Sequence, residues 1–460
     1  MRFGINSADR RRGHAAVKTL NRVSRTISRR SLLRIGGAVA TASTLTGAAA
    51  CAGKNQGSGN ASSALGMKWW GGDARTKAYQ AALAEYGRAH KSVTIKTEFS
   101  GYDGYFDKLD ADVAGGQVAD IIQMDTALVS EYAGRGVLRT LDDYVGNRLD
   151  LAGFPDALLA AGKVGGKLYG VPSGTGCALV TYDATVLKGA AVAPPSADWT
   201  WTDLATYATK LTKSLGGKVY GVADGGGDDE GAFQIFLRQR RKDLFTASGK
   251  LGYAASDLAE WLAYWDALRK RHGAAPGEVT SAAHNESGKN PLITGRTAMT
   301  FGSGLEISLP PLTSHDLDFV PVPQGPAGSV EGQYLSGGVL LSVYNRSSQA
   351  DASAGVIGYF AADEAAIKIM GITRGIPPTE KARQIAATQL QPAQQRALTA
   401  TDVVAKRVAA AKSVPPPSPP KGASQVKELL FQSNLAVAFG RKTVPAAVES
   451  FLAGATSALA

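Results

Sequence analysis

The sequence predicts an α/β protein whose folded body is divided into two lobes. Residues 67–125 alternate short apolar strands with helical stretches in the order βαβαβ. This order is typical of a parallel sheet with helices on both faces. Residues 165–182 lie between this run and a second α/β run, so we interpret them as a crossover between the lobes. From about residue 352 the chain is predicted to be largely helical.

The first 50 residues have the composition of an export signal. They hold ten of the 50 Lys and Arg residues but one of the 39 Asp and Glu residues. Arg29-Arg30, with Leu32 two places on, resembles a twin-arginine signal. The apolar run that follows is shorter than the roughly 20 residues that a membrane-spanning helix needs. We therefore predict that residues 1–50 direct export.

Cys51 follows three alanines, and this arrangement resembles a bacterial lipoprotein processing site. The resemblance implies a lipid anchor through Cys51 that holds the protein on the outer face of the cell membrane. The alternative is that Cys51 is an incidental thiol and that cleavage falls in the alanine run. Residues 51–66 are rich in Gly, Ser and Asn and are predicted to form a flexible tether.

The net charge of +11 does not indicate a nucleic-acid-binding protein. Because the excess of basic residues lies in the N-terminal signal, the body is nearly balanced, whereas a nucleic-acid-binding domain should carry a basic face. The body has one cysteine, Cys177, so no internal disulfide is expected. The fold must then depend on an apolar core.

The elements of the first lobe can be assigned in order. Strands are predicted at 67–70, 93–99 and 119–124, with a helix that Asp73 can cap and a second helix at 105–114 between them. The helical assignments follow from apolar residues that recur every three to four positions. In the crossover, a strand ending at Pro172 is followed by a bend of small residues and by a second strand at 178–182. Later strands are predicted at 219–222, 297–301, 317–323 and 334–343.

Ligands of parallel sheets bind beyond the carboxyl ends of the strands. Trp70 ends the first strand and Asp125 follows the third, so both are expected at that edge. An indole ring can pack against the C–H face of a sugar, and a carboxylate can accept hydrogen bonds from its hydroxyls. The alternatives are that Asp125 caps the next helix and that Trp69 or Trp70 simply packs in the core.

From residue 67 to the C-terminus the chain resembles the extracellular solute-binding proteins (family 1) that feed sugar ABC importers. The short motifs that carry the resemblance are WWGG (69–72), ADIIQMD (119–125), the crossover, GRTAMTFGSG (295–304), SGG (336–338) and GIPP (375–378). The resemblance implies a two-lobed periplasmic-binding-protein-like fold of type II, with parallel-sheet lobes, a hinge and a helical C-terminal region. It places residues 67–172 and a return at 297–343 in the first lobe, and residues 173–296 and 344–460 in the second.

The resemblance also implies a monomer that binds a mono- or oligosaccharide in the cleft and docks on a membrane permease. No enzymatic activity, cofactor, metal or nucleic acid is expected. Trp70 and Tyr105 are the predicted aromatic platforms and Asp125 the predicted hydroxyl acceptor. The remaining predicted ligand-binding residues are Asp73, Ser173, Ser303, Gly337, Gly338 and Arg374. The two glycines could instead form a β-bulge, and Arg374 could pair with a surface acid.

Other functions stay open at this point. A secreted glycoside hydrolase would need two carboxylates about 5–10 Å apart, which the sequence does not exclude. A peptide, polyamine or phosphate ester could replace the sugar in the cleft. The acidic run at 228–230 is expected to be a solvated loop, with a cation site as the alternative.

Overall fold

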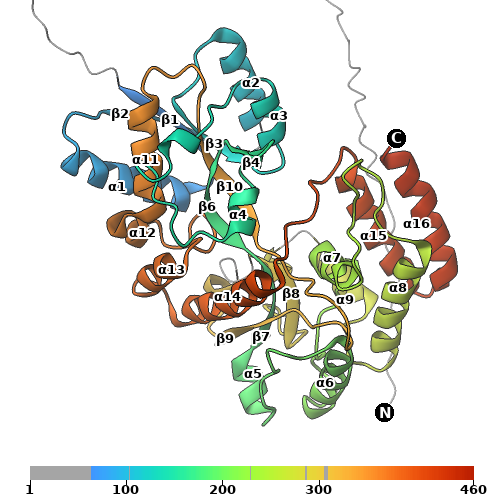
Figure 1. Cartoon of the computed structure of the whole chain (residues 1–460). Helices are drawn as coiled ribbons and strands as arrows, with labels where there is room; N and C mark the ends of the chain where they lie inside the picture. Colours follow the sequence, from blue (N-terminus) through green and yellow to red (C-terminus); the bar gives the residue numbers. More distant parts are fainter. Residues whose placement is uncertain (1–63, 103, 228, 285–286, 305–308) are drawn as a thin grey trace, which may run out of the picture. The chain divides into compact units, whose positions relative to one another are not determined.

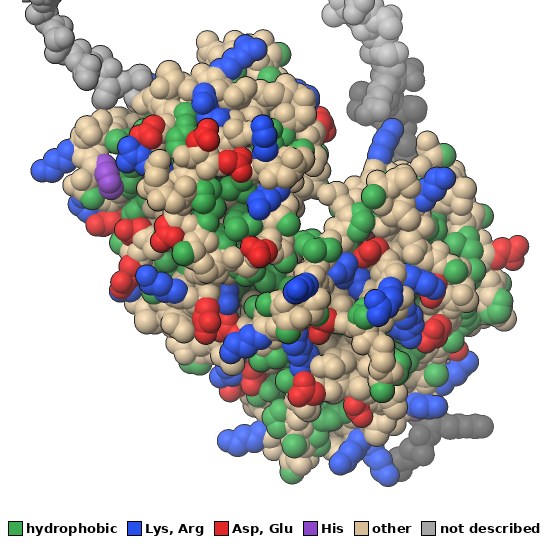
Figure 2. Space-filling view, viewed as in Figure 1, with side chains coloured by type: hydrophobic (Ala, Val, Ile, Leu, Met, Phe, Trp, Pro, Cys, Tyr) green, Lys and Arg blue, Asp and Glu red, His purple; other side chains and the backbone are tan. Residues whose placement is uncertain are grey.

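A computed structural model describes residues 64–102, 104–227, 229–284, 287–304 and 309–460. The predicted export signal, Cys51 and nearly all of the predicted tether lie outside these residues. The described chain forms two lobes, each with its own sheet and core (Figure 1), and the space-filling view shows a gap between the two lobes (Figure 2). Among the described residues, no helix combines the length and apolar character needed to cross a bilayer.

The sheet of the first lobe has five strands, and its parallel part is the predicted βαβαβ unit. Strand β1 pairs in parallel with β2 and β3, whereas β10 is antiparallel to both β3 and β6. The strands lie in the order β2 (Ile95–Ser100), β1 (Leu65–Trp70), β3 (Ile121–Asp125), β10 (Ser336–Val343) and β6 (Val171–Gly176). The carboxyl ends of β1, β3 and β6 therefore meet the beginning of β10 at one edge.

Helices cover both faces of this sheet because its strands are apolar on both sides. Trp69 packs in a core with α1 (Asp73–Ala89), α11 (Ala350–Ala362) and α12 (Glu364–Met370). Trp70 faces the opposite side, towards α2 (Tyr105–Gly115) and α3 (Val129–Gly134). A short helix, α4 (Asp156–Ala160), and a hairpin of β4 (Lys163–Val164) and β5 (Lys167–Leu168) complete the lobe.

The second lobe contains a three-stranded antiparallel sheet, so the predicted parallel sheet is confirmed only in the first lobe. Strand β7 (Ala178–Asp183) is central, between β8 (Met299–Ser303) and β9 (Leu317–Pro321). The helices of this part are α5 (Ala184–Gly189), α6 (Trp201–Ser214), α7 (Glu230–Arg238), α8 (Ala255–Lys270), α9 (Gly277–Ala283), α14 (Pro392–Ala411), α15 (Ala423–Ala438) and α16 (Val444–Ala458). A further helix, α13 (Glu380–Ala387), packs against both α12 and α14.

Tryptophans dominate the core of the second lobe. Trp261 and Trp265 are one helical turn apart on α8, so they lie on the same face, and both are fully buried. Trp201 of α6 packs edge-on against Trp261 at 5.3 Å between ring centroids. Each such ring contributes about 1.5–3 kcal/mol through the area it removes from water. Helices α15 and α16 pack against α8 (Figure 1).

The crossover prediction is confirmed, with one correction. Strand β6 belongs to the first sheet and β7 to the second, and Cys177 alone separates them. Pro172 does not end its strand, because β6 continues to Gly176 and Pro172 pairs with Leu340. A proline is tolerated there because β6 is an edge strand, on which a missing N–H breaks no ladder.

The predicted lobe boundaries need two further corrections. Of the predicted return at 297–343, only β10 joins the first sheet, since β8 and β9 pair with β7. Helices α11 and α12, assigned to the second lobe by sequence, pack in the core of the first. The chain then crosses a third time, through the segment 371–379, to α14, which packs on β9.

Candidate functional site

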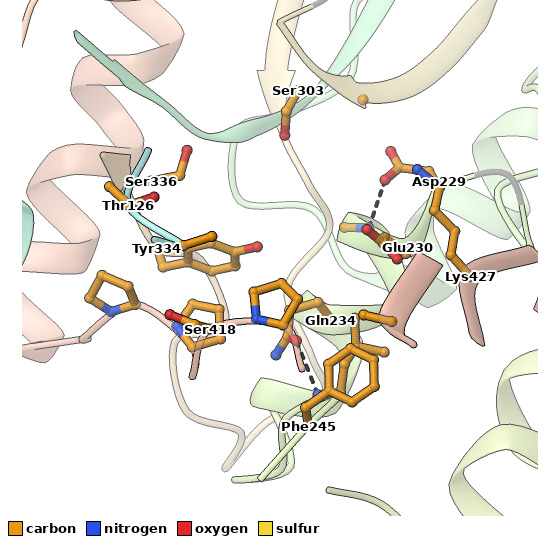
Figure 3. Close-up of a pocket in the computed structure, with 18 of the residues that line it drawn as sticks. Thr126, Asp229, Glu230, Gln234, Phe245, Ser303, Tyr334, Ser336, Ser418 and Lys427 are labelled. Carbon is orange, nitrogen blue, oxygen red and sulfur yellow. Dashed lines mark hydrogen bonds between the residues drawn. The ribbon is translucent and has the colours of Figure 1, made fainter. Parts of the chain in front are cut away.

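A cavity of about 1130 Å³ lies between the two lobes. Thr126 and Ala161 line it from the first lobe, and Glu230 and Ser303 line it from the second. Tyr334, in the connection from β9 to β10, completes the wall, and Figure 3 shows its ring between Ser336 and Glu230. Since Thr126 follows β3 directly, the cavity opens at the strand ends where the sequence predicted a ligand.

Aromatic side chains give the cavity an apolar surface. They are Tyr334, Phe245 and Phe301. Burial raises the pKa of Tyr334 to about 12, although the nearby Arg238 charge acts in the opposite direction. The phenol is therefore neutral at physiological pH and can both donate and accept a hydrogen bond. A ring of this kind suits a ligand that has both C–H faces and hydroxyls.

Two carboxylates reach the cavity from the beginning of α7. Asp229 is the N-cap of this helix, and its Oδ1 accepts hydrogen bonds from the N–H groups of Gly231 and Ala232 at 2.8 and 3.2 Å. Burial raises the pKa of Glu230, and the charge of Lys427 opposes that shift. The expectation of a solvated acidic loop is wrong for these two residues, which are half-buried in the cavity wall (Figure 3).

One arginine holds the proline-rich part of the wall. Residues 414–419 line the cavity, and four of these six residues are prolines, which have no backbone N–H. Arg238 Nη2 donates to Ser413 Oγ at 2.9 Å and to the Val414 carbonyl at 2.6 Å. Its Nε donates to the Gly332 carbonyl at 3.1 Å, two residues before Tyr334. Arg238 thus connects α7, the proline-rich segment and the Tyr334 loop.

A buried ion pair supports the opposite wall. Asp224 is fully buried at its side chain and lies 2.6 Å from Arg269 Nη1. Asn434 Nδ2 donates to the same carboxylate at 2.8 Å. The Trp261 indole N–H donates to the Gly226 carbonyl at 2.8 Å. These bonds fix the glycine loop that contributes Gly225 to the cavity lining.

Two of the predicted site residues line the cavity, and a third lies beside it. Ser303, at the end of β8, is exposed and faces the cavity (Figure 3). Gly337 lines it near the beginning of β10. Asp125 precedes Thr126, but its carboxylate is engaged by the Ala127 N–H at 2.8 Å and by the Tyr102 hydroxyl at 3.1 Å. The Asp125 carboxylate thus stabilises the turn before α3, but it does not cap this helix, whose N-cap is Leu128.

Trp70 and Tyr105 are not the predicted platforms. The structure leaves 7% of Trp70 and none of Tyr105 exposed, and both pack with Phe106 in the core of the first lobe. The Tyr105 hydroxyl donates to the carbonyls of Lys68 and Gln123, at 3.2 and 2.9 Å. This face of the sheet is covered by α2, so alternation along β1 turned Trp70 towards a helix and not towards the cleft.

The remaining predicted residues lie away from the lining. Asp73 is exposed in the first turn of α1, whose N-cap is Gly72. Ser173 is buried and donates to the Val339 carbonyl at 3.2 Å. Gly338 is exposed beside a register shift in β10, which fits the β-bulge alternative. Arg374 is buried in the first lobe and does not pair with a surface acid within the described residues.

Sequence reasoning missed Tyr334, Phe245 and Lys427. Tyr334 lies two positions before the first residue of the SGG motif, and that position was the available signal. Phe245 and Lys427 reach the cavity from segments almost 200 residues apart, so no local pattern could have joined them. The proline run was visible in the sequence as a turn but not as a wall of the site.

Comparison with known families gives a match over most of the folded body. The model of the bacterial extracellular solute-binding protein family matches residues 72–367. Curated binding proteins of Brucella abortus and Brucella suis are 27% identical over 129 residues, which is 28% of this chain. The matched stretch spans 30% of the length of those relatives.

Solved structures share the fold over 86% of this chain. A family 1 extracellular solute-binding protein from Alicyclobacillus acidocaldarius is 26% identical, with a TM-score of 0.77 and 98% of its own chain covered. An oligogalacturonide-binding protein from Yersinia enterocolitica, in complex with saturated digalacturonic acid, is 22% identical with a TM-score of 0.67 and 98% coverage. A Listeria monocytogenes ABC substrate-binding protein in complex with cycloalternan is 18% identical, with a TM-score of 0.64 and 99% coverage.

Proposed function

This chain belongs to the bacterial extracellular solute-binding protein family, and from this membership we propose that it captures a mono- or oligosaccharide outside the cell. In this proposal the sugar binds in the cavity between the lobes and is passed to the permease of an ABC importer. The observation that carries the proposal is the composition of the cavity wall, which combines the Tyr334 ring with the Glu230 carboxylate and the Ser303 hydroxyl (Figure 3).

Each part of that wall matches a part of a sugar. The ring of Tyr334 offers a flat surface to C–H groups, and the Glu230 carboxylate accepts hydrogen bonds from hydroxyls. Ser303 and Thr126 lie on opposite lobes, and the hydroxyl of each can donate or accept a hydrogen bond. Because both lobes contribute, a bound ligand would stabilise their closure around it. Two structural neighbours hold saccharides, namely saturated digalacturonic acid and cycloalternan, which supports the choice of ligand class.

Export and anchoring are part of the same proposal. The family is extracellular, and the signal-like residues 1–50 followed by Cys51 would place the protein on the outer face of the membrane. A lipid anchor through Cys51 would keep the binding protein close to its permease. In this proposal the protein acts as a monomer and has no enzymatic activity of its own.

Calorimetry of the mature protein against a panel of solutes tests the ligand class. The panel contains neutral oligosaccharides, digalacturonic acid, cycloalternan, spermidine and a short peptide. The proposal expects micromolar or tighter binding of at least one saccharide and none of spermidine or peptide. Binding of spermidine or peptide alone would contradict it. Release of new reducing ends from a bound oligosaccharide would instead indicate a glycoside hydrolase.

A further inference from the structure

Arg374 is a buried cation whose guanidinium is incompletely satisfied. Only 9% of the residue is exposed, in the segment that leaves α12 and crosses to the second lobe. Its Nη2 donates to the Phe360 carbonyl at 3.3 Å. Its Nε and Nη1 are buried and have no hydrogen-bond partner within the described part of the chain. Buried polar groups without partners are rare in native proteins, and an ion or a water usually explains them.

A second guanidinium, that of Arg75, is bonded to the residue that precedes Arg374. Arg75, on the first turns of α1, donates from Nε to the Thr373 carbonyl at 3.0 Å and from Nη1 to the Trp70 carbonyl at 3.2 Å. The pKa of Arg75 is lowered, chiefly by burial and additionally by the charge of Arg374. Within the described residues, neither arginine forms a salt bridge with a carboxylate. Two neighbouring positive charges are therefore held in the protein without a visible counter-charge.

The aromatic neighbours of Arg374 compensate only part of this cost. The guanidinium lies 5.1 Å from the ring centroid of Phe360 and 5.6 Å from that of Tyr79. Such contacts attract the positive charge through the quadrupole of the ring. An aromatic ring accepts an N–H group only weakly, however, so these contacts do not replace a hydrogen-bond acceptor. The groups that remain unsatisfied are donors, so the missing partner is an acceptor.

We propose that a small monovalent anion of the size of chloride binds at Arg374, beside Arg75, and accepts the N–H bonds of Arg374 Nε and Nη1. Its negative charge would offset the two guanidinium charges, and its small size agrees with the burial of the site. The chemistry is independent of the sugar proposal, because these residues do not line the cavity.

The position of this site connects it to the third crossing. The carbonyl of Thr373 accepts a hydrogen bond from Arg75. Two residues after Arg374, the N–H of Ile376 donates to the Thr175 carbonyl of β6 at 2.8 Å, and the Ile376 carbonyl accepts from the Thr175 N–H at 2.7 Å. The backbone of Arg374 also packs against Gly174. An anion here would therefore join α1 to the segment that carries the chain into the second lobe.

Thermal unfolding in bromide tests the site, with sodium gluconate at equal ionic strength as the reference for general salt effects. The change in Tm between the two salts is measured for the wild type and for Arg374→Met, which removes the charge but keeps an unbranched side chain. The proposal expects a stabilisation of the wild type, relative to Arg374→Met, that increases with bromide concentration and saturates. An identical salt response of the two proteins would overturn it.

Arg383 provides a matched control. It is also buried, at 5% exposed, and lies just beyond the same crossing, but its guanidinium is paired with Asp402 and with the carbonyls of Pro377 and Pro378. Arg383→Met should lower Tm in both salts and keep the response to bromide. Loss of that response in Arg383→Met as well would assign it to a general loss of stability.

Crystals of the wild type soaked in bromide give a second measurement, independent of any variant and usable even if Arg374→Met does not fold. The proposal expects an anomalous peak within hydrogen-bond distance of Arg374 Nε or Nη1. A bromide-soaked crystal whose anomalous map has no peak at Arg374 would overturn it.

Discussion

The guanidinium of Arg238 lies over the ring of Tyr334, 5.2 Å from its centroid. The same guanidinium bonds the Gly332 carbonyl and the start of the proline-rich segment, so one side chain sets the distance between two parts of the cavity wall. Its Nη1 also pairs with Asp243 at 2.8 Å, which fixes the guanidinium from a third direction. The shape of the cavity around Tyr334 therefore depends on a residue outside its lining.

Replacing Arg238 should loosen this wall. Arg238→Gln leaves Asp243 without its ion-pair partner, and the loss of a largely buried pair costs about 3 kcal/mol of the free energy of unfolding. Urea unfolding measures the effect, and hydrogen exchange should become faster in residues 332–334 and 413–414. Arg240→Gln is the control. Arg240 lies two positions after Arg238 in the sequence, but it pairs with Glu260, which is exposed. Equal losses in both variants would contradict the role given to Arg238.

Removing the Tyr334 ring should weaken the binding of the saccharide found in the panel. Tyr334→Ala gives up roughly 2 kcal/mol of ring contact, which corresponds to about a 30-fold increase in Kd. Calorimetry measures the change. Tyr207→Ala is the matched control, since Tyr207 is a half-buried tyrosine of the second lobe that does not line the cavity. Unchanged affinity in Tyr334→Ala would place the ligand elsewhere.

Glu230 should make stability depend on pH in the unusual direction for an acid. Burial raises the pKa of Glu230 in the folded state. The contribution of Glu230 to the free energy of unfolding is therefore fully present below the ordinary Glu pKa of about 4.3, and it is lost as pH rises through the pKa of the folded state. Glu230→Gln should match the wild type near pH 3.5 and be more stable at pH 7.

Glu364 gives a control of opposite sign. The hydrogen bond from Lys368 lowers its pKa, so its contribution is present above the ordinary value and is lost in acid. Glu364→Gln should therefore be slightly less stable than the wild type at pH 7. Thermal unfolding of both variants across this range is the measurement, and a shift of the same sign in both would refute the assignment for Glu230.

Gly174 should tolerate no side chain. A Cβ there would lie 2.1 Å from the Arg374 carbonyl oxygen, so the third crossing would have to move away from β6. We expect Gly174→Ala to cost about 3 kcal/mol or to prevent folding. Gly338→Ala is the comparison, because nothing lies within 4 Å of a Cβ at that position. Denaturant unfolding should show a change within about 0.5 kcal/mol for Gly338→Ala.

Cys51 should determine where the protein is found. Cells that express the full-length chain should retain it in the detergent phase on Triton X-114 partitioning if Cys51 is acylated. Cys51→Ser should move the protein to the aqueous phase. Cys177→Ser is the control, since Cys177 is buried between the lobes' strands and should not affect partitioning. Equal partitioning of wild type and Cys51→Ser would exclude the anchor.

The sequence was sufficient for the architecture where local patterns determine it. The helical spacing of Tyr79, Leu83 and Tyr86 and the mostly apolar run at 119–124 correctly identified the parallel unit of the first lobe. The lobe to which a strand belongs, however, depends on its pairing with segments that are distant in the sequence. Nothing within 297–323 indicates that β8 and β9 pair with β7, because these pairings depend on segments more than 100 residues away.

The same limit explains the partial success for the site. Ser303 and Gly337 were found because short motifs end beside the cavity. Trp70 was misplaced because alternation gives the face of a strand but not which element covers that face. Tyr334 and the proline-rich wall are brought together by Arg238, whose side chain bonds to positions 332 and 413–414. Such a convergence has no signature in the sequence.

The most direct test of the proposed function is a crystal structure of the protein with the ligand that co-purifies from its native host. We predict a saccharide between the lobes, with one ring against Tyr334 and a hydroxyl bonded to Glu230. A non-sugar solute in the cavity, or a saccharide bound at a surface that does not include Tyr334, would contradict the account.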